Sequence, residues 1–152
     1  MAEIPIRCRA VSAVVLRETV RGAEVLMMRR AGRLAGTWCQ VAGGIEEGET
    51  AWQAALREIG EETGLVPGAL YSADWCERFY EPDADVVSLL PVFVAYVDPA
   101  SDVRLNDEHD AHNWLSLAEA AGRVTFPGQR AMLAHVEAEF VRRAPEPRLR
   151  IV

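Results

Sequence analysis

Apolar positions alternate with polar turns along much of the chain, and this pattern predicts a β-rich domain. Short β-branched or aliphatic runs that are bounded by turn residues are typical of strands. Such runs lie at residues 10–18, 23–30, 37–41, 70–80 and 85–97, with a further strand end at 113–115. The polar segment 19–22 predicts a hairpin between the first two runs, and the sequence Glu81-Pro82-Asp83 predicts a turn between the two longest.

Two longer segments have helical spacing instead. Residues 50–63 are rich in helix formers, with Thr50 as the predicted N-cap and Gly64 as the predicted stop. Residues 126–143 predict a C-terminal helix, with Thr125 as its cap and Pro127 in its first turn. Its apolar face consists of Met132, Leu133, Val136, Phe140 and Val141. A shorter helix is expected at 117–122, and strands interleaved with helices predict a layered α/β or α+β domain.

The length and composition limit the organisation of the protein. A chain of 152 residues, half of them hydrophobic, suits one domain, which we expect at 1–144. We expect the tail at 145–152 to be either loosely ordered or packed on the surface. No stretch of about 18 apolar residues occurs, so neither a membrane span nor a signal peptide is expected. The three cysteines have no metal-binding or disulfide spacing, which favours a cytoplasmic protein.

The net charge argues against nucleic acid as a partner. A formal charge of −7 is poorly suited to a groove that must neutralise many phosphates. A small polyphosphate ligand is still compatible with this charge, because a divalent metal ion can supply the positive charge that the side chains lack.

Three carboxylates in the first predicted helix are the strongest chemical signal. Glu58, Glu61 and Glu62 are spaced so that they share one helix face. Clustered oxygen ligands suit Mg2+ or Mn2+, although a solvated acidic face has the same spacing. Ala51, Ala54 and Ala55 continue this side and predict room for a bulky ligand, whereas Trp52, Leu56 and Ile59 predict the face that packs on the sheet.

The segment before these acids predicts a tight loop that is tied to the helix. Gly43, Gly44 and Gly48 allow the backbone to approach a metal or a phosphate closely. Glu49 and Arg57 are placed to form an ion pair that fixes the angle at which the loop enters the helix.

Residues 43–65 resemble the Nudix box, G-x5-E-x7-R-E-U-x-E-E-x-G-U, where U is a bulky aliphatic residue. The matching residues are Gly43, Glu49, Arg57, Glu58, Ile59, Glu61, Glu62, Gly64 and Leu65. The resemblance implies an α/β/α sandwich with a mixed sheet, in which the box forms a loop–helix–loop. It also implies Glu58 and Glu62 as the main metal ligands, Glu61 as a further ligand or base, and the carbonyl of Ala42 as another ligand. In this reading Arg57, Glu49 and Gly43 brace the site.

The resemblance further implies a Mg2+-dependent enzyme, with Mn2+ as an alternative ion, that cleaves a diphosphate linkage. Water attacks phosphorus, a carboxylate accepts its proton, and phosphate or diphosphate leaves. Outside the box, Arg29 and Arg30 are candidates for binding substrate phosphate, or else are surface arginines. Glu108 is a candidate base or extra ligand, or else an exposed loop acid. His109 and His112 are alternative bases, but solvent-facing positions are the favoured reading for both.

The aromatic residues Trp75, Phe79 and Tyr80 follow the box and could stack on a nucleobase or pterin ring. Packing in the core is the favoured alternative for any one of them, and residues 93–96 are expected in the core. Tyr80 is retained as a candidate for substrate binding.

The longer segment 10–141 is similar to bacterial dihydroneopterin triphosphate and (d)NTP pyrophosphatases. This similarity predicts a small nucleoside triphosphate-like substrate with a diphosphate linkage. A dinucleoside polyphosphate, or a nucleotide sugar such as ADP-ribose, is the second choice, and a non-catalytic nucleotide-binding regulator is the third. Many Nudix proteins form dimers, so a homodimer is possible.

Overall fold

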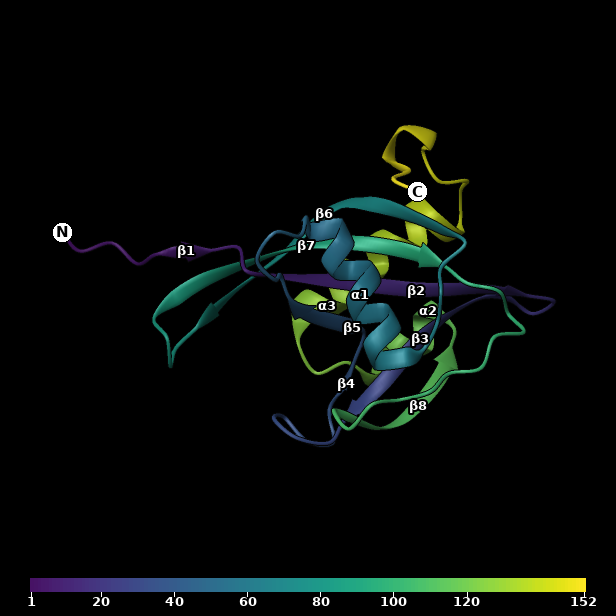
Figure 1. Cartoon of the computed structure of the whole chain (residues 1–152), viewed down its shortest axis with the longest axis horizontal. Coiled ribbons are helices and arrows are strands. Elements are labelled where there is room, and N and C mark those ends of the chain that lie inside the picture. The colour runs from purple at the N-terminus through teal and green to yellow at the C-terminus, as the bar shows by residue number, and fades with distance from the viewer.

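The apolar runs of the sequence form the strands of one mixed sheet (Figure 1). The computed structural model describes residues 1–152. The strands are β1 (Ile6–Arg7), β2 (Ala10–Thr19), β3 (Gly22–Arg30), β4 (Trp38–Cys39), β5 (Val41–Gly44), β6 (Ala69–Glu81), β7 (Val86–Tyr96) and β8 (His109–Leu115). The helices are α1 (Ala51–Thr63), α2 (Leu117–Arg123) and α3 (Pro127–Val136), followed by a π-helical turn (Glu137–Val141) and a 3-10 turn (Pro147–Leu149).

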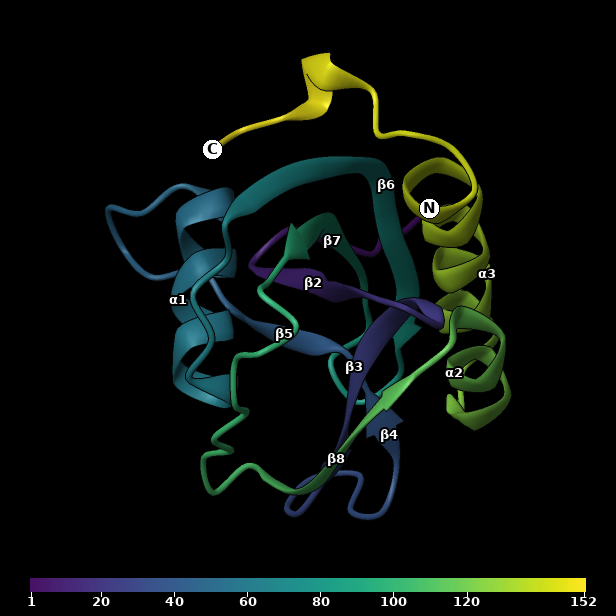
Figure 2. The same ribbon diagram turned by 90° about the vertical axis from the view of Figure 1, so that its right-hand side faces the viewer.

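Strand β2 lies at the centre of the sheet. It pairs antiparallel with β3 and β5 and parallel with β7, while β6 pairs with β7 and β8 pairs with β3. Helix α1 covers one face of the sheet, and α2 and α3 cover the other (Figure 2). Because both faces are covered, β2 is buried continuously from Val11 to Leu16 instead of at alternate positions, and all of these residues except Ser12 are apolar. The predicted α/β/α sandwich with a mixed sheet is confirmed.

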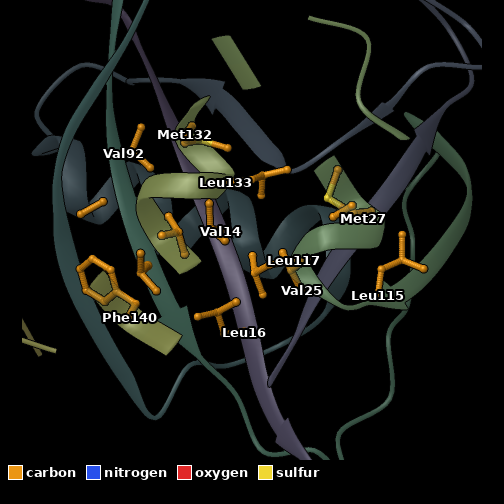
Figure 3. Packing of buried hydrophobic residues seen from close by; sticks show 14 of the residues in the cluster. Val14, Leu16, Val25, Met27, Val92, Leu115, Leu117, Met132, Leu133 and Phe140 are labelled. Atoms are coloured by element: carbon orange, nitrogen blue, oxygen red, sulfur yellow. The ribbon is translucent and has the colours of Figure 1, made fainter. Parts of the chain in front are cut away.

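Successive residues of β2 enter two separate cores. Val14 and Leu16 point toward α2 and α3, where Met132 and Leu133 pack against them (Figure 3). Val11, Ala13 and Val15 belong to the core beneath α1. In α1, Ala54 and Ala55 are completely buried in this second core. The prediction that these alanines leave room for a ligand is therefore wrong, because they instead let the helix approach the sheet closely.

The ends of α1 are those that the sequence predicts. The Thr50 side chain accepts a hydrogen bond from the backbone N–H of Gln53, whose own side chain accepts from Thr50 N in return. Gly64 ends the helix with a left-handed backbone (φ 70°). This geometry fixes where the helix carrying the three glutamates begins and stops.

The C-terminal helix differs in detail from the prediction. Its N-cap is Phe126, not Thr125, because the Gln129 side chain reaches back and accepts a hydrogen bond from Phe126 N (3.2 Å). Pro127 occupies the first turn, as predicted. After Val136 the α-helix widens into the π-helical turn, which keeps Phe140 buried against the sheet.

Two predicted strand features have different outcomes. The hairpin of β2 and β3 is confirmed, whereas the expected strand at 37–41 is divided into β4 and β5 on either side of Gln40.

The tail after residue 144 packs on the sheet, since Ile151 N donates to Leu70 O (2.8 Å) and Leu70 N donates to Val152 O (3.0 Å). No helix is both long enough and apolar enough to cross a membrane.

Candidate active site

Arg57 ties the loop before α1 to the helix, as the sequence predicts. Its Nη2 lies 2.7 Å from Glu49 Oε1 and 2.7 Å from the carbonyl oxygen of Gly44, while Nη1 lies 2.8 Å from Glu58 Oε1. Hydrogen bonds from Arg57 lower the pKa of the Glu49 carboxyl, and those to Glu49 and Glu58 raise the pKa of the guanidinium. One planar side chain thus holds the loop, the end of β5 and a glutamate in fixed relation.

Gly43 is placed where no side chain fits. A Cβ atom at this position would lie 2.0 Å from Cδ of Glu58, so the Glu58 carboxylate lies directly against the backbone of β5. The Glu58 side chain is only 12% exposed, and burial raises its pKa while Arg57 opposes the shift. The glycine is required here for close approach.

Glu62 is the most deeply buried of the three acids. The residue is 2% exposed, and its Oε2 has no hydrogen-bond partner. Burial, with the nearby charges of Glu58 and Glu108, raises the pKa of Glu62 to about 8. A buried carboxylate that is close to other negative charges and has one oxygen without a donor is well suited to binding a cation.

Glu61 shares the helix face but not the burial. Its side chain is 55% exposed and makes a 3.2 Å contact with Nη1 of Arg57. The helical spacing therefore brings the three carboxylates to one side of α1, but at three different depths.

A cleft of about 390 Å3 opens beside Glu62. Its walls come from the end of β3, β5, α1, and the loop that leads into β8. The lining residues are Arg30, Gly32, Arg33, Gln40, Ala42, Glu62, Asp107, Glu108 and His109. This size and this concave shape are typical of a small-molecule site, and the lining is almost entirely polar.

The loop before β8 brings a second group of ligating atoms to Glu62. The Ala31 N–H donates to Glu108 O (2.9 Å), and the Glu108 N–H donates to Asn106 Oδ1 (3.1 Å), so the backbone of Glu108 is fixed. One ligating atom each from Glu62, Glu108 and His109 lie within 4.8 Å of one another.

His109 does not face solvent, and that expectation is wrong. The residue is 7% exposed, its Nε2 lies 3.6 Å from Cys39 Sγ, and its Nδ1 has no hydrogen-bond partner. Burial lowers its pKa, with the positive charge of Arg30 acting in the same direction. His112, three residues later in β8, is exposed as expected.

The two candidate arginines have different surroundings. Arg30 lines the cleft, and its positive charge lowers the pKa of Glu62. Arg29 points elsewhere, because its Nε lies 2.6 Å from Oδ1 of the half-exposed Asp110 at the surface. The structure therefore brings only Arg30 of this pair to the cleft.

The three aromatic candidates also lie outside the cleft. Trp75, Phe79 and Tyr80 are exposed, so the prediction that they pack in the core is wrong. Tyr80 donates a hydrogen bond to Asp85 (2.8 Å) across the β6–β7 hairpin, and Trp75 stacks on His135 of α3. In the stretch 93–96, three residues are buried and Tyr96 is half-buried, in line with the expected core position.

Sequence reasoning missed several residues that line the cleft. Gln40 forms part of its floor, where Nε2 donates to Ser12 Oγ (2.9 Å) and Oε1 accepts from Gln129 Nε2 (3.2 Å). Arg33 and Asp107 come from the loops after β3 and before β8. Gln40 is a polar residue inside the predicted strand at 37–41, and this was a usable signal. The loops that carry Arg33 and Asp107 have no sequence pattern that predicts which way they fold.

The donor set fits a divalent metal ion. The negative charges of Glu58 and Glu108 both raise the pKa of Glu62, and the charge of Glu108 also raises the pKa of Glu58, so the three carboxylates lie close together. Their oxygens are hard donors, and Glu62 Oε2 is buried without a partner. Ala42 lines the same cleft, so its backbone lies within the group.

Comparison with known proteins agrees with this geometry. The family model of the NUDIX domain matches residues 6–143. A Myxococcus xanthus protein named octanoyltransferase is 38% identical over 84% of the chain, which spans 36% of that protein's length. A Caenorhabditis elegans asymmetrical bis(5'-nucleosyl)-tetraphosphatase is 29% identical, with 74% of this chain and 81% of the relative covered.

Solved structures show the same fold. A C. elegans Ap4A hydrolase superposes with a TM-score of 0.74 at 24% identity, over 85% of this chain and 94% of the other. The dihydroneopterin triphosphate pyrophosphohydrolase of E. coli gives a TM-score of 0.69 at 25% identity, over 91% and 98%. The complete box, the braced acidic helix and the match over most of the chain lead to one conclusion: this protein belongs to the NUDIX family and is a hydrolase acting on pyrophosphate bonds.

Proposed function

We propose that this protein is a Mg2+-dependent pyrophosphohydrolase of a nucleoside triphosphate-like substrate: a (d)NTP, a damaged nucleotide or dihydroneopterin triphosphate. The observation that carries the proposal is the cleft itself. It places the cationic Arg30 beside Glu62, a buried carboxylate with an unpartnered oxygen. A site with phosphate-binding cations on one wall and metal-binding carboxylates on the other suits a polyphosphate chain.

The residues of the chain divide the work between them. Glu58 and Glu62, with Glu61 and the Ala42 carbonyl, would hold Mg2+, and Mn2+ would fit the same oxygen donors. When bound, the ion would neutralise charge on the diphosphate and lower the pKa of a coordinated water. Arg30 and Arg33 line the cleft and would bind phosphate oxygens. Glu108, or alternatively Glu61, would accept the proton as water attacks phosphorus and phosphate or diphosphate leaves.

Two observations bear on the substrate. The similarity to the E. coli dihydroneopterin triphosphate pyrophosphohydrolase extends over 91% of the chain and supports a triphosphate. The similarity to a C. elegans bis(5'-nucleosyl)-tetraphosphatase favours a dinucleoside polyphosphate as the second candidate.

A nucleotide panel would test the proposal directly. The purified protein would be incubated with Mg2+ and with (d)NTPs, dihydroneopterin triphosphate, dinucleoside polyphosphates and ADP-ribose, and the products would be identified by mass in H2(18)O. We expect a triphosphate to be cleaved fastest, with one 18O atom in a phosphate-containing product. Release from dinucleoside polyphosphates alone would select the second candidate. No release from any member, with ligand binding retained, would contradict the enzyme assignment.

Variants of the acidic helix would locate the chemistry. Glu58→Gln and Glu62→Gln should lower turnover by roughly two to four orders of magnitude, since each removes a charge that the site needs. Glu119→Gln, an exposed acid of α2 on the opposite face of the sheet, is the matched control and should keep full turnover. Full activity in either box variant would contradict the assignment of these residues.

A further inference from the structure

We propose that Glu62, Glu108 and His109 form a mixed nitrogen–oxygen metal position, which binds Mn2+ or Co2+ in preference to Mg2+. The proposal rests on the proposed function in taking the cleft as the metal-binding site. It goes further in two respects. It assigns His109 as a metal ligand, and it states that the position formed with Glu62 and Glu108 prefers a different ion from the rest of the site.

Unsatisfied polar atoms identify the position. In the whole chain, the buried side-chain nitrogen and oxygen atoms without a hydrogen-bond partner are Glu62 Oε2 and His109 Nδ1. Both residues are more than nine-tenths buried, at 2% and 7% exposure. Burying such atoms without a partner is unfavourable, because each has lost its hydrogen bond to water. The two atoms belong to residues of the same cluster, so one cation would satisfy both.

The separation of the ligating groups fits one ion. One ligating atom each from Glu62, Glu108 and His109 lie within 4.8 Å of one another. Donors that bind a metal at about 2.1 Å lie roughly 3–4 Å apart, so small side-chain rotations would close the site. Glu108 is exposed while the other two are buried, which leaves one side of the position open to the cleft.

An irregularity in β8 directs His109 into the cleft. Arg29 pairs with Ala111, but Arg30 pairs with His109, so Asp110 is an extra residue in the ladder. Directly paired residues of antiparallel strands point to the same side. The extra residue therefore places His109 on the side of Arg30, which lines the cleft, and sends Asp110 outward to Arg29. In a regular antiparallel ladder in which Arg29 pairs with Ala111, Arg30 would pair with Asp110 instead of His109.

Cys39 orients the imidazole. The buried Sγ lies 3.6 Å from His109 Nε2. In the proposed site Nε2 is protonated and donates a hydrogen bond to Sγ of Cys39. Nδ1 is then unprotonated, and its lone pair is free to bind a metal ion. Histidine ligands generally have such a partner on the second ring nitrogen, and it fixes both the tautomer and the ring plane.

The nitrogen donor determines which ion is preferred. Mg2+ strongly favours oxygen ligands and keeps much of its water, whereas imidazole suits later divalent ions. Affinity at a nitrogen-containing site rises from Mn2+ to Co2+. The oxygen-only donors around Glu58 would remain suited to Mg2+, so the two positions would differ in ion preference.

The test compares His109→Asn with His112→Asn, the exposed histidine on the same strand. Full-length, metal-free protein would be titrated with Mn2+, Co2+ or Mg2+ alone by calorimetry. Pulsed EPR of the Mn2+ samples would detect coupling to a coordinated 14N nucleus. We expect 14N coupling in the wild type and in His112→Asn. His109→Asn should lose it and bind Mn2+ and Co2+ about tenfold or more weakly, with Mg2+ binding nearly unchanged.

The outcomes separate this proposal from the proposed function. If the wild type hydrolyses nucleotides with Mg2+ but its Mn2+ shows no 14N coupling, the histidine ligand is wrong and the hydrolase stands. If 14N coupling is present and lost in His109→Asn while no nucleotide is cleaved, the metal position stands and the function fails. Circular dichroism of both variants would establish that they are folded, and coupling that persists in folded His109→Asn would overturn the proposal.

Discussion

At the scale of single residues, the contact between Gly43 and Glu58 shows how closely the strand and the helix approach. A Cβ atom at Gly43 would overlap the Glu58 carboxylate, at a separation that no side chain tolerates. A methyl group here would displace the carboxylate, because the backbone of β5 is fixed by its pairing with β2. The glycine thus determines where the carboxylate of Glu58, our proposed metal ligand, lies.

Gly43→Ala should therefore destabilise the protein by about 1–3 kcal/mol and weaken divalent metal binding. Urea unfolding and Mn2+ calorimetry would measure the two effects. Gly60→Ala is the matched control within α1, where a Cβ would meet no atom within 4 Å. It should stabilise the helix by about 0.5–1 kcal/mol. Wild-type metal affinity in Gly43→Ala would show that Glu58 does not depend on this contact.

The spacing of the glutamates predicted their common face but not their depth. Helical geometry places Glu58, Glu61 and Glu62 on one side of α1 whatever surrounds the helix. Their exposure, which ranges from 2% for Glu62 to 55% for the Glu61 side chain, depends on how α1 rests on the sheet. Ala54 and Ala55 allow α1 to lie close to the sheet. Their burial depends on contacts with the sheet, so it could not be predicted from the sequence of the helix alone.

At the scale of elements, one arginine joins a loop, a strand end and a helix. Arg57 is 21% exposed and its partner Glu49 is 16% exposed, so their ion pair is shielded from solvent more than a surface pair. The flat guanidinium reaches Glu49, Gly44 and Glu58 at once. An ammonium group has the same charge but cannot span these three acceptors.

Arg57→Lys should cost about 1–3 kcal/mol of unfolding free energy and reduce turnover, because the loop loses its fixed angle to the helix. Denaturant unfolding and steady-state kinetics on the same preparation would check both. Glu46→Gln serves as the control, since Glu46 is 69% exposed and 3.9 Å from Arg57. It should change stability by less than about 0.5 kcal/mol. Equal losses in the two variants would argue against a bracing role for Arg57.

The elements themselves were predictable wherever a local signal marks their ends. Thr50 and Gly64 mark the ends of α1 by side-chain and backbone chemistry within a few residues. The start of β8 has no such mark, and the sequence predicted only its last three residues. The extra residue Asp110 arises from pairing with β3, some 80 positions earlier in the chain, and interrupts the alternation that sequence reasoning uses.

At the scale of the whole molecule, the C-terminal tail adds to the sheet. Ile151 packs against the core beneath α1, and the backbones of Ile151 and Val152 bond to Leu70. The tail thereby covers part of the edge of β6, whose free N–H and C=O groups would otherwise be open to another chain. The division into a domain at 1–144 and a tail remains a prediction.

Removal of residues 145–152 tests that division. We expect the shortened chain to fold with about 1–3 kcal/mol less stability, because three backbone hydrogen bonds to Leu70 and the burial of Ile151 are lost. Urea unfolding followed by tryptophan fluorescence would measure the change. Arg148→Ala, an exposed position in the same segment, should be nearly neutral. A shortened chain that does not fold would show that the domain extends past residue 144.

The parallel pairing of β2 with β7 also has a consequence for the order in which the chain can fold. Ser12 pairs with Val92, so the central strand lacks one neighbour until about 80 further residues have left the ribosome. Contacts at such separations close slowly and leave an apolar strand edge unpaired meanwhile. Glu108 and His109 emerge later still. The acidic helix is therefore made long before the residues that complete its cleft, so the site cannot be complete until residue 109 has been made.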